Sequence, residues 1–222
     1  MTGARSRRRW PAVVLLAAAC YIAVRVVGGP PSGPAPRPAP AVPVPAPPTG
    51  PAQPSATATT GPYDPADHGA QVRRRAGQAG VSARLLMAIL YNESYKPHEP
   101  GLERAWQKYK PDAAFGIANM HRATFDATKK DRDFANRSWD ELPDDRDLAI
   151  EAAAWYLHDL AAVLPAHWPA PYSRSDLLAL GYNTGQGNML AFARGATPGS
   201  QARSYLDKLH ANWARAGRAV RS

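Results

Sequence analysis

The chain has 222 residues, a formal net charge of +9 and one cysteine, Cys20. This length allows one domain with a hydrophobic core and an additional terminal segment, and a single cysteine excludes an intrachain disulfide. Six arginines and no acidic residue lie in residues 1–63, which leaves only +3 for residues 64–222. Because the basic excess lies mainly near the N-terminus, we expect no nucleic-acid partner.

Residues 1–28 combine an arginine-rich start with an apolar run over residues 11–24. This order is typical of an export signal, and positive charge before the apolar run favours passage of the following chain out of the cytoplasm. The run is short for a spanning helix, but snorkelling by Arg25 would extend it. We therefore expect an exported, extracytoplasmic protein. It is either anchored in the membrane by this N-terminal segment or secreted to the cell wall after cleavage of a signal peptide.

Residues 29–63 consist almost entirely of Pro, Ala, Gly, Ser, Thr and Val. Such a segment lacks the large apolar side chains needed for a core and favours extended polyproline II structure. We expect a disordered Pro/Ala-rich linker, followed by one folded domain over residues 64–222.

The domain is predicted to be mainly α, because helical spacing of apolar residues recurs and alternating strand patterns do not. It is expected to be a monomer. A first helix should end at Gly80, and a second should begin after the N-cap Ser82 and stop before Pro97. Further helical segments are expected at residues 138–142, 144–164, 173–185 and 200–216. The first of them has the spacing of a capping box, from Ser138 to Glu141. Only loops or short helices are expected at residues 97–113 and 128–138.

Glu93 falls on the same helix face as Leu85, Leu86, Ile89 and Leu90. One interpretation is a carboxylate at the rim of the core that pairs with an arginine. The other is a general acid, because burial raises the pKa of a carboxyl group and keeps it protonated near neutral pH. Helix geometry alone leaves both interpretations open.

No metal site or cofactor is predicted. The six histidines show no paired ligand spacing, and the chain has no glycine-rich phosphate loop.

Four segments occur in a defined order: AILYNES at residues 88–94, AAFGIANMHRATF at 113–125, LALGYNTG at 178–185 and QARSYL at 201–206. In this order, residues 68–216 resemble the catalytic domain of the soluble lytic transglycosylases, which are relatives of goose-type lysozyme. The resemblance implies a lysozyme-like globular helical domain that acts on peptidoglycan glycan strands. It also implies cleavage of the MurNAc–GlcNAc β-1,4 bond with a 1,6-anhydro product.

The resemblance implies that Glu93 is the catalytic acid and base, and that Ser94 orients its carboxyl group. Tyr182 and Asn183 would line the cleft opposite Glu93 and bind substrate, and Tyr205 would form part of the cleft floor. Without the resemblance, the favoured interpretation is that Tyr182 and Tyr205 are core aromatics and that Asn183 ends a helix.

The glycine turn of the family corresponds here to Gly116, Ile117, Ala118 and Asn119, of which Gly116, Ile117 and Asn119 are expected to bind substrate. The family has Met and Gln where this chain has Ala118 and Asn119, and Pro where it has Arg122. These differences bear on substrate preference more than on the chemistry.

Two other functions remain open at this stage. A lysozyme-type muramidase of the same fold would hydrolyse the bond and would need Asp112 or Asp126 to hold a water molecule. A glycan-binding or scaffold module would keep the cleft without its activity.

Overall fold

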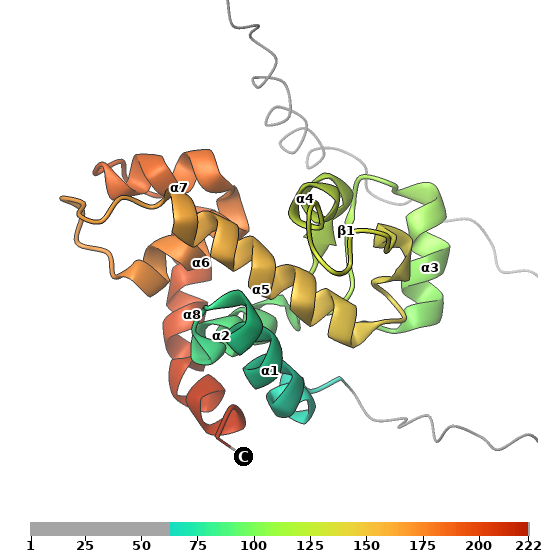
Figure 1. Ribbon diagram of the computed structural model, residues 1–222. Coiled ribbons are helices and arrows are strands. Elements are labelled where there is room, and N and C mark those ends of the chain that lie inside the picture. The colour runs from blue at the N-terminus through green and yellow to red at the C-terminus, as the bar shows by residue number, and fades with distance from the viewer. Residues whose placement is uncertain (1–62, 222) are drawn as a thin grey trace, which may run out of the picture. The chain divides into compact units, whose positions relative to one another are not determined.

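The structure is a computed structural model that describes residues 63–221 (Figure 1). The expected signal or anchor and nearly all of the expected linker lie outside these residues. Tyr63, expected at the end of the linker, packs against the domain core. No helix in the described part of the chain is long and apolar enough to cross a membrane.

Helix α2 (Ala83–Glu93) is the centre of the domain, since every residue from Leu85 to Glu93 is buried. A short 3-10 helix, η1 (Pro65–His68), leads into α1 (Gly69–Ala79). These elements and the C-terminal helix α8 (Ser200–Ala219) pack around α2. The Ser82 side chain caps α2 by accepting from the Leu85 N–H, and Gly80 ends α1 in the left-handed conformation that glycine tolerates.

A small lobe follows α2. It contains α3 (Pro100–Tyr109), the strands β1 (Ala114–Phe115) and β2 (Met120–His121), α4 (Arg122–Thr128) and the 3-10 helix η2 (Trp139–Glu141). The strands are antiparallel, with Ala114 paired to His121 and Phe115 to Met120. The Trp139 indole N–H donates to the Met120 carbonyl at 2.8 Å and fixes the hairpin against η2.

Helix α5 (Arg146–Val163) runs between this lobe and the helices α6 (Arg174–Thr184) and α7 (Gln186–Ala193) (Figure 1). It is buried along most of its length because its sequence is rich in alanine and leucine. Asp145 and Ser173 cap the N-termini of α5 and α6 with their side chains.

The expectation of a mainly α domain is confirmed. The predicted caps at Ser82 and Gly80 and the capping box from Ser138 to Glu141 are also confirmed. Two details differ. Helix α2 ends at Glu93, before the expected stop at Pro97, and a two-stranded hairpin precedes α4. Residues 97–113, where loops or short helices were expected, hold the ten-residue helix α3.

Candidate active site

Glu93 is the last residue of α2, and only 7% of its surface is exposed. Its two carboxyl oxygens accept hydrogen bonds from different elements. The Tyr205 hydroxyl donates to Oε1 at 2.9 Å, and the Asn119 Nδ2 amide donates to Oε2 at 3.0 Å. Both donors are neutral, so the carboxyl group is held in place without a direct ion pair to an arginine.

Tyr205 comes from α8 and is itself fixed by α2. The side-chain amide of Asn92 donates to the Tyr205 carbonyl at 2.9 Å, and the Asn92 oxygen accepts from Asn212 at 3.0 Å. Asn92 therefore binds the backbone of Tyr205, and the adjacent Glu93 binds its side chain. This double attachment sets the direction from which Tyr205 reaches Glu93.

Asn119 reaches Glu93 from the hairpin turn. Its amide nitrogen donates to the Glu93 backbone carbonyl at 3.0 Å as well as to the side chain. Lys96 Nζ donates to Asn119 Oδ1 at 2.7 Å. Because an ammonium group can only donate, this bond fixes which side of the amide is oxygen and directs Nδ2 toward Glu93.

The turn that carries Asn119 requires an unusual backbone. Gly116 has φ +70, and a Cβ there would lie 2.9 Å from the Leu142 carbonyl oxygen. Asn119 has φ +46, which asparagine tolerates better than most residues. The Gly116 N–H donates to Glu103 Oε2 at 2.9 Å, so helix α3 anchors the turn.

His98 completes the frame around the end of α2. It is 3% exposed, with Nδ1 at 2.9 Å from Glu103 Oε1 and Nε2 at 3.1 Å from the Glu93 carbonyl oxygen. Glu103 thus connects the hairpin turn, through Gly116, to the C-terminal end of α2, through His98.

Burial is the main influence on the charge of Glu93, and it raises the pKa of this carboxyl group above its usual range. The hydrogen bonds from Tyr205 and Asn119 and the positive charges of Lys96 and His98 act in the opposite direction. Burial also lowers the pKa of Lys96 and raises that of Tyr205 well above its ordinary value. The site therefore favours a protonated Glu93 and also holds donors that would stabilise its ionised form.

The remaining residues expected at the site occupy varied positions. The Tyr182 hydroxyl donates to the Ala118 carbonyl at 2.7 Å, and the charge of Glu93 helps burial to raise the pKa of Tyr182. Asn183 is exposed on the same helix. The Ser94 hydroxyl donates to the Tyr91 carbonyl at 2.8 Å, and the Ile117 side chain is 2% exposed, within the core.

A crevice of about 40 Å³ adjoins Asn119 and Tyr182. Met120, His121, Thr124 and Tyr156 complete its lining. Its volume is close to that of one water molecule, so a sugar would have to lie across its opening. Asp126, one of the two acids considered for holding a water, is paired with Arg122 and Lys129.

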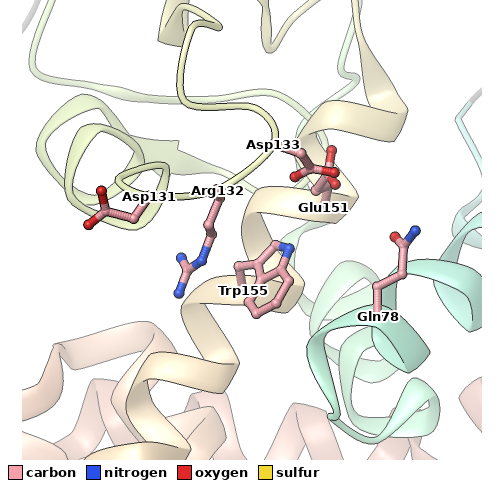
Figure 2. A pocket seen from close by; sticks show the side chains of 6 residues that line it. All are labelled: Gln78, Asp131, Arg132, Asp133, Glu151 and Trp155. Atoms are coloured by element: carbon pink, nitrogen blue, oxygen red, sulfur yellow. The ribbon is translucent and has the colours of Figure 1, made fainter.

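A second pocket, of about 390 Å³, lies elsewhere, between α1, α5 and the loop at residues 131–133 (Figure 2). It contains none of the residues that contact Glu93. Its buried acid, Glu151, is paired with Arg75, and the Arg132 guanidinium stacks over the Trp155 ring at 4.6 Å. Glu151, Arg132 and Trp155 thus have structural partners already, which separates this pocket from the site at Glu93.

Within residues 63–221, no group of three or more His, Cys, Asp or Glu residues is arranged to hold a metal ion.

Four residues of the site were not singled out by the sequence: Asn92, Lys96, His98 and Glu103. Asn92 acts through its bonds to α8. The roles of the other three depend on the backbone between Glu93 and Gly116, where His98 has φ +48 and turns the chain back toward α2. The sequence predicted only loops or short helices here and did not indicate which side chains would point inward.

Comparison with known families gives one result for this architecture. Residues 71–203, more than half of the chain, match the model of the family described as "Transglycosylase SLT domain". A search of the curated proteins finds no match.

Proposed function

Because the chain belongs to the family of transglycosylase SLT domains, whose members act on peptidoglycan, we propose that it is a lytic transglycosylase with Glu93 as the general acid and base. It would cleave the MurNAc–GlcNAc β-1,4 bond and leave a 1,6-anhydro product. Action on peptidoglycan places this function outside the cytoplasm, in agreement with the export segment expected at residues 1–28.

One observation carries the assignment of Glu93. Its carboxyl group is buried at the end of α2 and is held by two neutral donors, Tyr205 and Asn119. A general acid must be protonated before the reaction and must remain stable after it has lost the proton. Burial serves the first requirement, and the two donors serve the second.

The reaction would proceed in two proton transfers. Glu93 would first donate its proton to the glycosidic oxygen as the bond from that oxygen to the MurNAc C1 breaks. The ionised Glu93 would then accept the proton of the MurNAc 6-hydroxyl as the 6-oxygen bonds to C1. The 2-acetamido group of the sugar would assist at C1 between these steps, which agrees with the need for only one carboxyl group.

Two further residues support the placement of a glycan near this acid. Tyr182, fixed to the Ala118 carbonyl, borders the crevice beside Asn119. Asn183 follows it at the exposed surface, where its amide could bind an N-acetyl group of the substrate.

The test is mass spectrometry of purified peptidoglycan after digestion with the full chain. We expect products that end in 1,6-anhydro-MurNAc, and we expect none from Glu93→Gln purified in the same way. Reducing-end products without the anhydro sugar would instead identify a muramidase. Peptidoglycan binding without any cleavage by the parent chain would identify a glycan-binding module. Equal cleavage by Glu93→Gln would show that Glu93 is not the acid.

A further inference from the structure

Helix α3 turns its large apolar residues outward. None of its residues is buried, and the three that are partly covered are Pro100 and the polar residues Glu103 and Gln107. Leu102, Trp106 and Tyr109 are 65%, 56% and 78% exposed. Their spacing of four and three residues places them on one side of the helix.

This exposure is concentrated in one part of the described chain. Five large hydrophobic side chains are exposed among residues 63–221. Tyr95, at 69%, precedes α3, and only Val163 lies on another helix. Isolated exposed apolar residues are common, but a contiguous group marks a surface that contacts another apolar phase or partner.

Basic side chains border this apolar face. Lys108 and Lys110 lie beside Trp106 and Tyr109 at the C-terminal end of α3, and both are exposed. Neither forms an ion pair with a residue in the described range. The acid at the other end, Glu99, accepts the Leu102 N–H at 2.7 Å as the helix cap. At the end that carries the aromatic rings, the exposed Asp112 follows the two lysines, so residues 108–112 keep a net charge of +1.

We propose that the face formed by Leu102, Trp106 and Tyr109 docks onto a lipid bilayer that contains anionic phospholipids. Trp and Tyr rings favour the boundary between headgroups and acyl chains, and flanking lysines attract anionic headgroups. An amphipathic helix with these features lies in the plane of the interface. The inference does not depend on the proposed activity.

The size of the face argues for a bilayer over a second copy of the chain. Three side chains of this kind bury roughly 150–250 Å² each when covered. A stable protein interface needs about 800 Å² from each partner. Membrane docking has no such threshold, because an attached chain needs only a weak additional contact to orient its domain.

The position of α3 in the domain is compatible with contact to a bilayer. The Tyr63 ring lies 5.1 Å from the His98 ring, and His98 contacts Glu103 of α3. Tyr63, the first described residue, is therefore separated from α3 only by the His98 side chain. In Figure 1, α3 lies at the edge of the domain, with the hairpin between it and α4.

The experiment uses the full chain with Cys20→Ser, so that one new cysteine carries an environment-sensitive fluorophore. The probe is placed at Leu102→Cys or, as a matched control, at Ala214→Cys, an exposed position on α8. Both proteins are mixed with vesicles of phosphatidylcholine, alone or with phosphatidylglycerol. We expect a blue shift, and quenching by nitroxide-labelled lipid, at position 102 and not at position 214, and only with the anionic vesicles.

Two double variants separate the contribution of the aromatic rings from that of the lysines. Trp106→Ser with Tyr109→Ser should reduce the ratio of docked to free domain at least about tenfold, measured with the probe at position 102. Lys108→Glu with Lys110→Glu should reduce it at least about fivefold, while Lys208→Glu on α8 should not.

Three results would overturn the proposal. Equal signals at positions 102 and 214 would show that the whole domain, or the N-terminal segment alone, contacts the bilayer. An unchanged signal in the Trp106→Ser, Tyr109→Ser protein would exclude this face. A blue shift without lipid that grows with protein concentration would assign the face to a second copy of the chain.

Discussion

Two glutamates are buried among the described residues, and they differ in the charge of their direct partners. Glu151, on α5, is 5% exposed and pairs with Arg75, which also binds Asp147. Glu93, at the end of α2, is 7% exposed and is bonded by Tyr205 and Asn119, which carry no charge. Burial raises the pKa of both carboxyl groups.

The comparison shows that burial alone does not identify a reactive acid. The positive charge of Arg75 in direct contact lowers the pKa of Glu151 against the effect of burial, and this pair attaches α1 to α5. Neutral donors leave Glu93 able to exist in either protonation state. The partners of a buried acid therefore distinguish a chemical role from a structural one, and the predictions below test this distinction.

The largest effect is expected at Glu93. Glu93→Gln should lower the rate of peptidoglycan cleavage by about 10²–10⁴-fold, the contribution typical of a general acid. The free energy of unfolding should not fall, because a neutral amide replaces a carboxyl group whose ionisation is opposed by burial. Turbidity clearing and thermal melts of the same preparation would measure both quantities. A large loss of stability would mean that Glu93 is structural, like Glu151.

Arg75→Ala should lower the free energy of unfolding and leave the rate of cleavage nearly unchanged, the opposite of Glu93→Gln. It leaves Glu151 buried without its cation, so we expect the free energy of unfolding to fall by about 3 kcal/mol. Cleavage measured well below the melting temperature should stay within about twofold of the parent. The neighbouring Arg74→Ala is the control, since its exposed pair with Asp147 should contribute less than about 1 kcal/mol. A large loss of cleavage in folded Arg75→Ala would contradict the separation of the two regions.

Tyr205→Phe should have an intermediate effect on the rate. Removing the hydroxyl takes away a donor that favours ionised Glu93, so the pKa of Glu93 should rise further. The alkaline limb of the profile of kcat/KM against pH should move to higher pH, and the rate should fall about tenfold, the equivalent of one hydrogen bond to a charged group. Tyr172→Phe, outside the site, should leave the profile unchanged. An unshifted limb would mean that the Tyr205 hydroxyl does not act on Glu93.

The smallest effect concerns stability and pH. Because burial raises the pKa of Glu93 above its usual value of 4.5, ionisation opposes folding as the pH rises through the folded-state pKa. Glu93→Gln lacks this cost. Its free energy of unfolding relative to the parent should therefore increase with pH above about 4.5 and level off beyond the folded-state pKa. Urea titrations at several pH values would measure the difference, and a constant difference would exclude a raised pKa.

Much of the fold could be predicted from local sequence signals. The cap at Ser82, the terminating glycine at position 80 and the capping box at Ser138 act within one helical turn, so the sequence displays them directly. For residues 97–113 the sequence left loops and short helices open, because the large apolar residues of α3 face outward and the usual rule places them inward. The hairpin strands are two residues long, too short to show an alternating pattern.

The site was less accessible to sequence reasoning than the helices. The burial of Glu93 follows from its place on an apolar face, which the sequence shows. Its partners Tyr205 and Asn119 lie 112 and 26 residues away, and only the packing of α8 and the hairpin brings them together. The difference at Asn119, interpreted from the sequence as a change in the substrate wall, is also a change in a direct partner of Glu93.

The position of Tyr63 has a mechanical consequence. The chain enters the domain at this ring, which packs edge-on against His98, and His98 lies at hydrogen-bond distance from the Glu93 carbonyl. A pulling force on the N-terminal segment would thus reach the end of α2 through these ring and hydrogen-bond contacts and, in parallel, through η1, which also packs against α2. If residues 1–28 hold the chain in a membrane while the domain holds a glycan strand, tension between them would load the contacts that frame Glu93.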